Sequence, residues 1–144
     1  MTFEGSGEED NPTQEIVNYK KEQELFRILR DYGEERFAKS IAASIVLARK
    51  EKKITKTKDL LEAVQAGVPK SYKNNNKIHY ATRTFQAIRI ASNRELERLE
   101  SALPQALEKL KRGGRLIVVS FHSLEDRIVK NFFKNEARDC ICPP

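Results

Sequence analysis

Polar side chains that could carry acid–base or nucleophilic chemistry crowd into one short stretch, Ser120 to Arg127, which reads SFHSLEDR. An imidazole can take or give a proton near neutral pH, so His122 is a candidate catalytic residue, although it could equally bond the backbone of a turn. The serines on either side suggest a Ser–His nucleophile. The G-x-S-x-G elbow is absent, however, and Ser123 suits a helix N-cap, so we expect no hydrolase chemistry.

The acidic residues of this stretch have structural explanations too. Glu125 and Asp126 could form a pair of carboxylates, but both fall in the first turn of a predicted helix, where the helix dipole favours acids. We expect a structural role for Asp126 and keep Glu125 as a candidate. Arg127 could contact a phosphate or form a salt bridge, and the sequence leaves both open.

A second polar cluster lies between His79 and Arg89. Arg83 and Arg89 could contact phosphates and Gln86 could read a base edge, or the segment is a solvated helix start. The chain has neither G-x-G-x-x-G nor a Walker A motif, so spacing alone indicates no cofactor site. The two cysteines, at 140 and 142, would need further ligands to hold a metal, and we expect reduced thiols and no metal site.

The elements that must position the first cluster are a strand and a helix. Leu116 to Val119 form an unbroken apolar run, typical of a strand buried on both faces, and we place this strand at 115–121. Ser123 and Asp126 fit a capping box that starts a helix over 124–134. The polar turn between them lies where open α/β sheets bind ligands.

The remaining chain is predicted to be helical. After an acidic lead-in at 1–11, apolar residues at helical spacing predict short helices up to Pro69. A basic, Asn-rich loop is expected at 70–77 and a long amphipathic segment follows, broken at Pro104. Only one strand is convincing, and one strand cannot make a sheet. We therefore expect a piece of a longer polypeptide, or a chain that borrows strands from a partner.

Composition indicates an anionic partner. The 144 residues carry a net charge of +6, and bases gather between positions 49 and 58. No stretch reaches the apolar length of a membrane span and no signal peptide is recognisable, so we expect a cytoplasmic protein. A homodimer is left open. The lysines that could hold an RNA backbone are Lys50, Lys52, Lys53, Lys56, Lys58, Lys70, Lys73 and Lys77.

Two long motifs carry a family resemblance: GGRLIVVSFHSLEDRIVKNFF and KIHYATRTFQAIRIASNREL. Together with YGEERFA at 32–38 and CICPP at the end, they resemble the bacterial MraW family, which methylates N4 of a cytosine in small-subunit (16S) ribosomal RNA. One departure is Tyr80, where the family commonly has proline. A larger one is that the family's glycine-rich donor-binding loop has no counterpart here.

The resemblance implies an α/β fold, a class I Rossmann-like methyltransferase with a helical insertion. In this mostly helical chain, 12–78 would be the insertion and 79–144 part of the methyltransferase domain, with one late sheet strand. The implied cofactor is S-adenosylmethionine, with no binding residues in this chain, and the implied partner is the small ribosomal subunit. The target pocket would use His122, Ser123 and Glu125, with Arg83, Gln86, Arg89, Arg127 and the lysines on RNA.

On this reading the chain is a partial methyltransferase that is inactive alone. One rival is a non-catalytic, basic helical RNA-binding module, which salt-dependent RNA binding without donor binding would favour. A second rival is a scaffold segment whose strand completes the sheet of another protein.

Overall fold

The computed structural model describes residues 11–74 and 78–138, and divides the chain into two compact units that meet between Asn93 and Arg94. Within the described ranges every regular element is a helix, and none of these helices has the length and apolar composition needed to cross a membrane. The two units are described separately.

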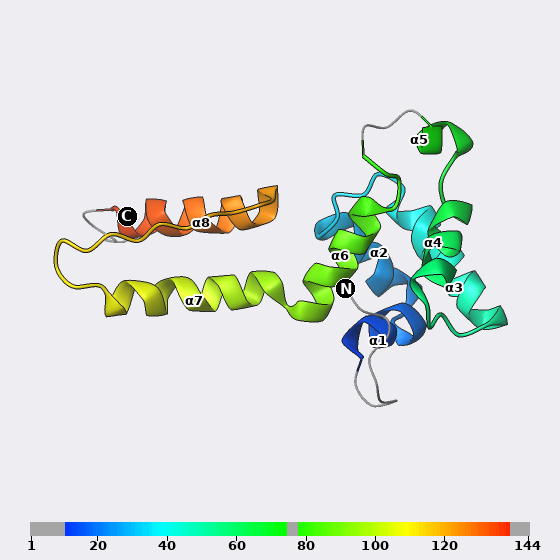
Figure 1. Cartoon of the computed structure of the whole chain (residues 1–144), viewed down its shortest axis with the longest axis horizontal. Helices are drawn as coiled ribbons and strands as arrows, with labels where there is room; N and C mark the ends of the chain where they lie inside the picture. The colour runs from blue at the N-terminus through cyan, green and yellow to red at the C-terminus, as the bar shows by residue number, and fades with distance from the viewer. Residues whose placement is uncertain (1–10, 75–77, 139–144) are drawn as a thin grey trace, which may run out of the picture. The chain divides into compact units, whose positions relative to one another are not determined.

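The first unit is a bundle of short helices around one apolar core (Figure 1). Its helices are α1 (Pro12–Tyr19), α2 (Glu22–Asp31), α3 (Ala38–Glu51), α4 (Thr57–Ala66), α5 (Lys70–Asn74) and α6 (Thr82–Asn93). Helix α3 packs against α1, α2 and α4, and α6 packs against α1 and α2. Fully buried side chains include Leu25, Leu29, Ile41, Ile45, Leu60 and Ile88. Each such side chain contributes about 1.5–3 kcal/mol to folding.

Side-chain bonds to the backbone hold the helix ends of this unit in place. Asn11 caps α1, because its Oδ1 accepts from the N–H of Thr13 at 3.1 Å. Asn18 bonds both backbone groups of Ile54, each at 2.9 Å, and so joins α1 to the loop before α4. Arg49 donates to the carbonyls of Val17 and Lys20 at 2.8 and 2.7 Å, so this base is used to fasten α3 to the end of α1.

Two glycines allow close approach between backbones in the first unit. A Cβ on Gly33 would lie 2.7 Å from the carbonyl oxygen of Arg83, at the contact between α2 and α6. A Cβ on Gly67 would lie 2.7 Å from the Cα of Ile41, at the contact between α4 and α3. Distances this short exclude a side chain, so the sequence needs glycine at both positions.

The second unit contains two helices and an extended segment between them. Helix α7 (Glu95–Lys109) packs against α8 (Ser123–Glu136), and both helices begin at the same end of the unit (Figure 1). The chain turns after α7 at Gly113, whose φ of +82° favours glycine, and then runs back along α8. Among the described residues of this unit, Leu103 of α7 and Val129 of α8 are the buried apolar ones, 4% and 8% exposed.

The expected sheet strand at 115–121 is not formed in the described residues; the prediction of a strand there was wrong for this chain. A strand is defined by pairing, and the described residues supply no neighbouring strand. The exposure nevertheless alternates along the segment: Leu116, Val118 and Ser120 are half-buried, whereas Ile117, Val119 and Phe121 are 83%, 73% and 91% exposed. The backbone thus has the two-residue period of a strand, with one face covered.

Several predicted boundaries need correction. Helix α8 begins at Ser123, and the N-cap is His122 instead of Ser123. Helix α7 continues through Pro104, where a break was expected; burial of Leu103 offsets a large part of the roughly 3 kcal/mol that an interior proline costs. The break lies instead at Arg94, which has a left-handed φ of 52°. Residues 70–74 form a short helix where a loop was expected.

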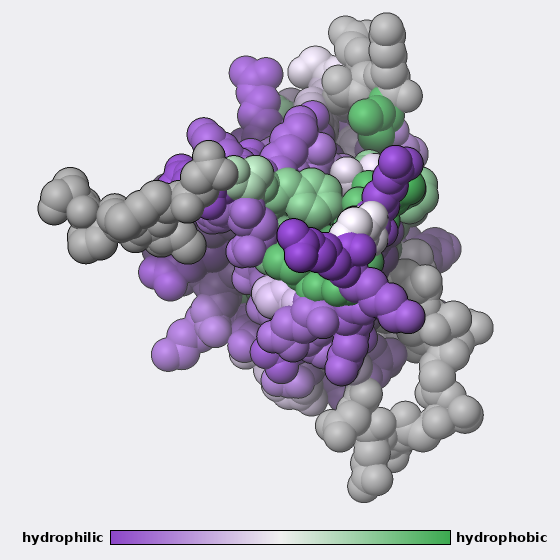
Figure 2. Space-filling model, turned by 90° about the vertical axis from the view of Figure 1, so that its left-hand side faces the viewer, coloured by the Kyte–Doolittle hydropathy of each residue, from purple (hydrophilic) through white to green (hydrophobic). Residues whose placement is uncertain are grey.

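Hydrophobic residues of the second unit reach the surface. Figure 2 looks onto the ends of α7 and α8 and shows hydrophobic residues between hydrophilic ones. Besides the three residues of the extended segment, Leu107 and Phe133 are 39% and 38% exposed. The face of the extended segment that carries Ile117, Val119 and Phe121 is therefore accessible to a partner.

Candidate functional site

His122 and Glu125 come together where the extended segment meets α8. The Nδ1 atom of His122 accepts a hydrogen bond from the Glu125 N–H at 3.3 Å, and so caps the helix. The Oε2 atom of Glu125 accepts from the N–H of Phe121 at 2.8 Å, and its Oε1 lies 3.4 Å from Nε2 of His122. The two side chains are 11% and 24% exposed. Backbone bonds therefore hold both side chains in one orientation.

The imidazole leaves one polar atom without a hydrogen bond. Nε2 of His122 is buried and has no hydrogen-bond partner within the described residues. A buried N–H or nitrogen in this state costs free energy unless a further group satisfies it. The atom lies 3.4 Å from Oε1 of Glu125, so the imidazole and the carboxylate are held next to one another.

The other residues predicted for this pocket lie nearby but are more exposed. Ser123 is the first residue of α8, and its side chain is at the surface. Arg127 is exposed one turn further along α8. Asp126 pairs with Lys130 at 2.7 Å, in agreement with the structural role expected for it. His122 and Glu125 are thus the pair that the structure brings into contact.

Glu95, which was not predicted as a site residue, belongs to the same cluster. Glu95, His122 and Glu125 each bring one nitrogen or carboxylate oxygen to within 4.8 Å of the others. Glu95 is the first residue of α7, and it is half-buried. In the sequence, Glu95 falls within the long amphipathic segment that was predicted after residue 77. The signal that could have found it is an acid three residues after Ser92, the spacing of a capping box at a helix start.

The polar residues of α6 form a separate group in the first unit. Arg83 donates from Nη1 to the carbonyl of Glu34 at 2.8 Å, beside the close contact at Gly33. Gln86 is half-buried and Arg89 is exposed on the same helix. Arg83 therefore has a structural function at the junction of α2 and α6 and is at the same time exposed to solvent.

The predicted RNA-binding lysines gather mainly at the end of α3 and the start of α4. Lys52 pairs with Asp59 at 3.4 Å and Lys58 with Glu62 at 3.9 Å, while the Lys53 ammonium lies 5.7 Å from the centre of the Tyr19 ring. Lys50, Lys56 and Lys70 are exposed and Lys73 is half-buried; Lys77 lies outside the described residues, as do Cys140 and Cys142. Exposed ion pairs of this kind are weak, so these lysines can exchange their partner for a phosphate.

Asp59 and Tyr72 are among the titratable groups of the first unit whose pKa is shifted. Burial raises the pKa of Asp59, but the backbone N–H of Lys56 and the ammonium of Lys52 outweigh burial and lower it overall. Burial also raises the pKa of Tyr72, and the neighbouring carboxylate of Glu35 adds to this. Glu35 is 3% exposed and accepts from the N–H of Phe37 at 3.0 Å, so it anchors the start of α3.

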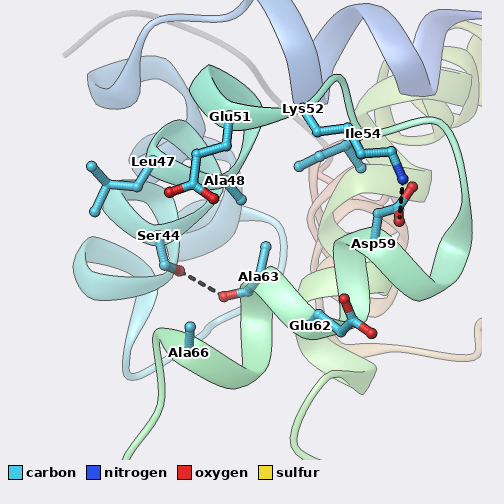
Figure 3. Close-up of a pocket in the computed structure, with 10 residues that line it drawn as sticks. All are labelled: Ser44, Leu47, Ala48, Glu51, Lys52, Ile54, Asp59, Glu62, Ala63 and Ala66. Carbon is cyan, nitrogen blue, oxygen red and sulfur yellow. Dashed lines mark hydrogen bonds and ion pairs between the residues drawn. The ribbon is translucent and has the colours of Figure 1, made fainter.

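A groove of roughly 370 Å³ lies between α3 and α4 (Figure 3). Its floor is made of small and apolar residues, and Leu47 at its edge is 62% exposed. Ser44 crosses it with a hydrogen bond to the carbonyl of Ala63 at 2.8 Å, and the Lys52–Asp59 pair closes one end. The groove contains neither the imidazole nor the arginines predicted for the pocket.

Comparison with known proteins places the chain among methylases. The model of the MraW methylase family matches residues 6–144, and the chain belongs to this family. It is 51% identical over 137 residues to the "Ribosomal RNA small subunit methyltransferase H" of Pelobacter propionicus, covering 95% of this chain and 44% of the relative. The protein of the same name from Heliobacterium modesticaldum is 54% identical over 129 residues, 90% of this chain and 41% of the relative.

These relatives are much longer than the chain, which spans less than half of their length. The resemblance to the MraW family that two sequence motifs indicated is confirmed. The mostly helical character of the chain is confirmed as well.

Proposed function

We propose that this chain supplies the RNA-binding surface and part of the target pocket of a ribosomal RNA methyltransferase. The reaction that we infer is the S-adenosylmethionine-dependent methylation of N4 of a cytosine in the 16S RNA of the small subunit. The family match over nearly the whole chain is the observation that carries this proposal. The His122–Glu125 pair, held beside an unpaired extended segment, supports it.

The described residues do not fit the methyl donor. Donor binding in a Rossmann-like fold uses a glycine-rich turn between a strand and a helix. Within the described residues, the strand-like turn into a helix is the one that starts α8, and the N–H of Glu125 in its first turn bonds His122 where a donor site would have a glycine-rich loop. We therefore assign donor binding to a segment that this chain does not contain, and derive no step through the donor.

The chain's own residues would hold and orient the target base. A base in folded RNA has to leave its stack to reach an enzyme pocket. The carboxylate of Glu125, which lies 3.4 Å from the imidazole of His122, could then accept a hydrogen bond from the amine on its edge and take the proton that the amine loses. Lysines near the α3–α4 loop and the arginines of α6 would bind the RNA backbone.

The test supplies the missing segment. The part of the Pelobacter propionicus relative that lies outside the match would be co-expressed with this chain, and the complex incubated with small subunits and methyl donor. Mass spectrometry of the RNA would measure N4-methylcytidine. We expect methylation by the complex and none by either part. A stable complex that binds donor and subunits without methylating them would contradict the proposal.

A second candidate function rests on the basic surface alone. The exposed lysines of the first unit favour a non-catalytic RNA-binding module. This function predicts salt-dependent binding of the chain to RNA that persists when His122 and Glu125 are both replaced. Loss of methylation with unchanged RNA affinity in the same double variant would favour the enzyme.

A further inference from the structure

Tyr19, the last residue of α1, carries a large aromatic ring on the surface of the first unit. It is 68% exposed, whereas Val17, two positions earlier on the same helix, is fully buried. The apolar core therefore does not explain an aromatic ring at this position. Single exposed aromatic residues are common on protein surfaces, so the surroundings of the ring decide whether it has a binding role.

These surroundings are basic. The ammonium of Lys53, from the loop between α3 and α4, lies 5.7 Å from the centre of the ring, within the range of a cation–π contact. Lys20 and Lys21 follow Tyr19 directly in the sequence. The carboxylate of Glu24 pairs with Lys20 at 3.5 Å, but in the described part of the chain no carboxylate pairs with Lys53. The ring thus borders an ammonium that is available to an anion.

Side-chain hydrogen bonds hold the backbone that carries the ring and the ammonium. Asn18, the residue before Tyr19, bonds both backbone groups of Ile54 at 2.9 Å each. Ile54 directly follows Lys53, so these two bonds fix the end of α1 against the loop. Arg49 adds bonds of 2.8 and 2.7 Å to two carbonyls at the same end of α1. Because the backbone is already ordered, a contact at the ring costs little conformational entropy.

An exposed ring beside an ammonium matches one nucleotide of a single-stranded nucleic acid. A base stacks on an aromatic side chain, and every base has a π-face, so the contact does not depend on the sequence. The ammonium can bind the phosphate of the same strand. Bases within a duplex stack on one another and offer no free face, so this arrangement favours unpaired RNA.

We propose that Tyr19 is a stacking site for an unpaired base of RNA, with Lys53 bound to a phosphate beside that base. The inference rests on the RNA-binding part of the proposed function and adds to it a preference for single-stranded over duplex RNA. It uses neither the His122–Glu125 pair nor the methyl donor, so it can be tested on the 144-residue chain.

The first experiment measures the dissociation constant for a fluorescein-labelled oligouridylate of about 12 residues, a length that one such surface can cover. Tyr19→Leu keeps an apolar side chain but removes the ring, and should raise the dissociation constant on the order of tenfold. Tyr19→Phe keeps the ring and should leave the constant unchanged. Phe121→Leu is the matched control, because it removes a ring that is 91% exposed in the second unit, and it should have no effect. Both Tyr19 variants should melt near the wild type, since the side chain is exposed.

The second experiment distinguishes stacking from other contacts. With 2-aminopurine, a fluorescent base, in the middle of the oligonucleotide, wild type and Tyr19→Phe should quench the emission and Tyr19→Leu should not, because stacking on an aromatic ring causes the quenching. Lys53→Gln should lower the slope of log affinity against log salt by roughly 0.7, the value for one phosphate contact with a single strand. Tyr19→Leu and Lys39→Gln, an exposed lysine at the other end of α3, should leave the slope unchanged.

Equal affinities of wild type and Tyr19→Leu for the single strand, or equal quenching by the two, would overturn the stacking site and leave RNA binding by the lysines in place. An equal loss of affinity for a duplex RNA of the same length would also overturn it, because a paired base cannot stack on the ring. If the wild-type chain binds neither RNA, the RNA-binding part of the proposed function fails together with the stacking site.

Discussion

Replacing Phe121 by serine should weaken the association between this chain and the remaining segment of the methyltransferase that we propose. Its ring is 91% exposed in the isolated chain, so nearly all of its apolar surface is available to a partner. Complete burial of a phenylalanine side chain contributes about 1.5–3 kcal/mol. At 1.4 kcal/mol for each factor of ten, the dissociation constant should rise roughly 10- to 150-fold.

The assay is titration of one labelled part of the enzyme with the other, followed by fluorescence anisotropy. Tyr19→Ser is the matched control, because Tyr19 is an aromatic residue that is 68% exposed in the first unit and far from this segment in sequence. The melting temperature of the isolated Phe121→Ser chain should stay near that of the wild type, since little of the ring is buried. Equal dissociation constants for wild type and Phe121→Ser would refute the idea that the apolar face of residues 117–121 is covered by the partner.

Three further predictions concern stability and are checked by denaturation of the isolated chain. Gly67→Ala should lower the free energy of unfolding by about 1–3 kcal/mol, since its Cβ would lie 2.7 Å from the backbone of Ile41; an unchanged value would contradict the close packing of α3 and α4. His122→Ala should destabilise α8 by about 1 kcal/mol through loss of its cap, whereas Ser123→Ala should change little; the reverse order would restore Ser123 as the cap. The pKa of Asp59 is lower in the folded protein than in the unfolded chain, where it is near 3.8. The ionised carboxylate therefore stabilises the fold at pH values above 3.8, and this contribution is lost as the pH falls through the pKa of the folded protein. The difference in the free energy of unfolding between wild type and Asp59→Asn should therefore shrink in acid. A difference that is constant with pH would contradict a lowered pKa of Asp59 in the folded protein.

The sequence predicts the helices of the first unit well, because their apolar stripes coincide with the buried faces. Leu25 and Leu29 of α2, and Ile41 and Ile45 of α3, are all fully buried. Helical periodicity alone carries this information, since an amphipathic stripe has to face a core. The positions of the helix ends were less predictable, as a cap depends on one or two hydrogen bonds.

The second unit shows what local patterns cannot settle. Ser123 has the better intrinsic preference for an N-cap, but Nδ1 of His122 performs this function. Pro104 disfavours helix, but burial of Leu103 keeps α7 continuous. Glu95 could not be placed beside His122 and Glu125, because these residues are more than 25 positions away and only the packing of α7 on α8 brings them close.

The imidazole of His122 caps α8 and also belongs to the target pocket that we propose, so occupancy of that pocket would be coupled to the order of the helix. A ligand that holds the ring in place also protects the amide of Glu125, to which the ring is bonded. A ligand that pulls the ring away leaves that amide exposed to water and loosens the first turn of α8. The rate of hydrogen exchange at the Glu125 amide should therefore fall if a ligand holds the ring in place and rise if the ligand pulls it away.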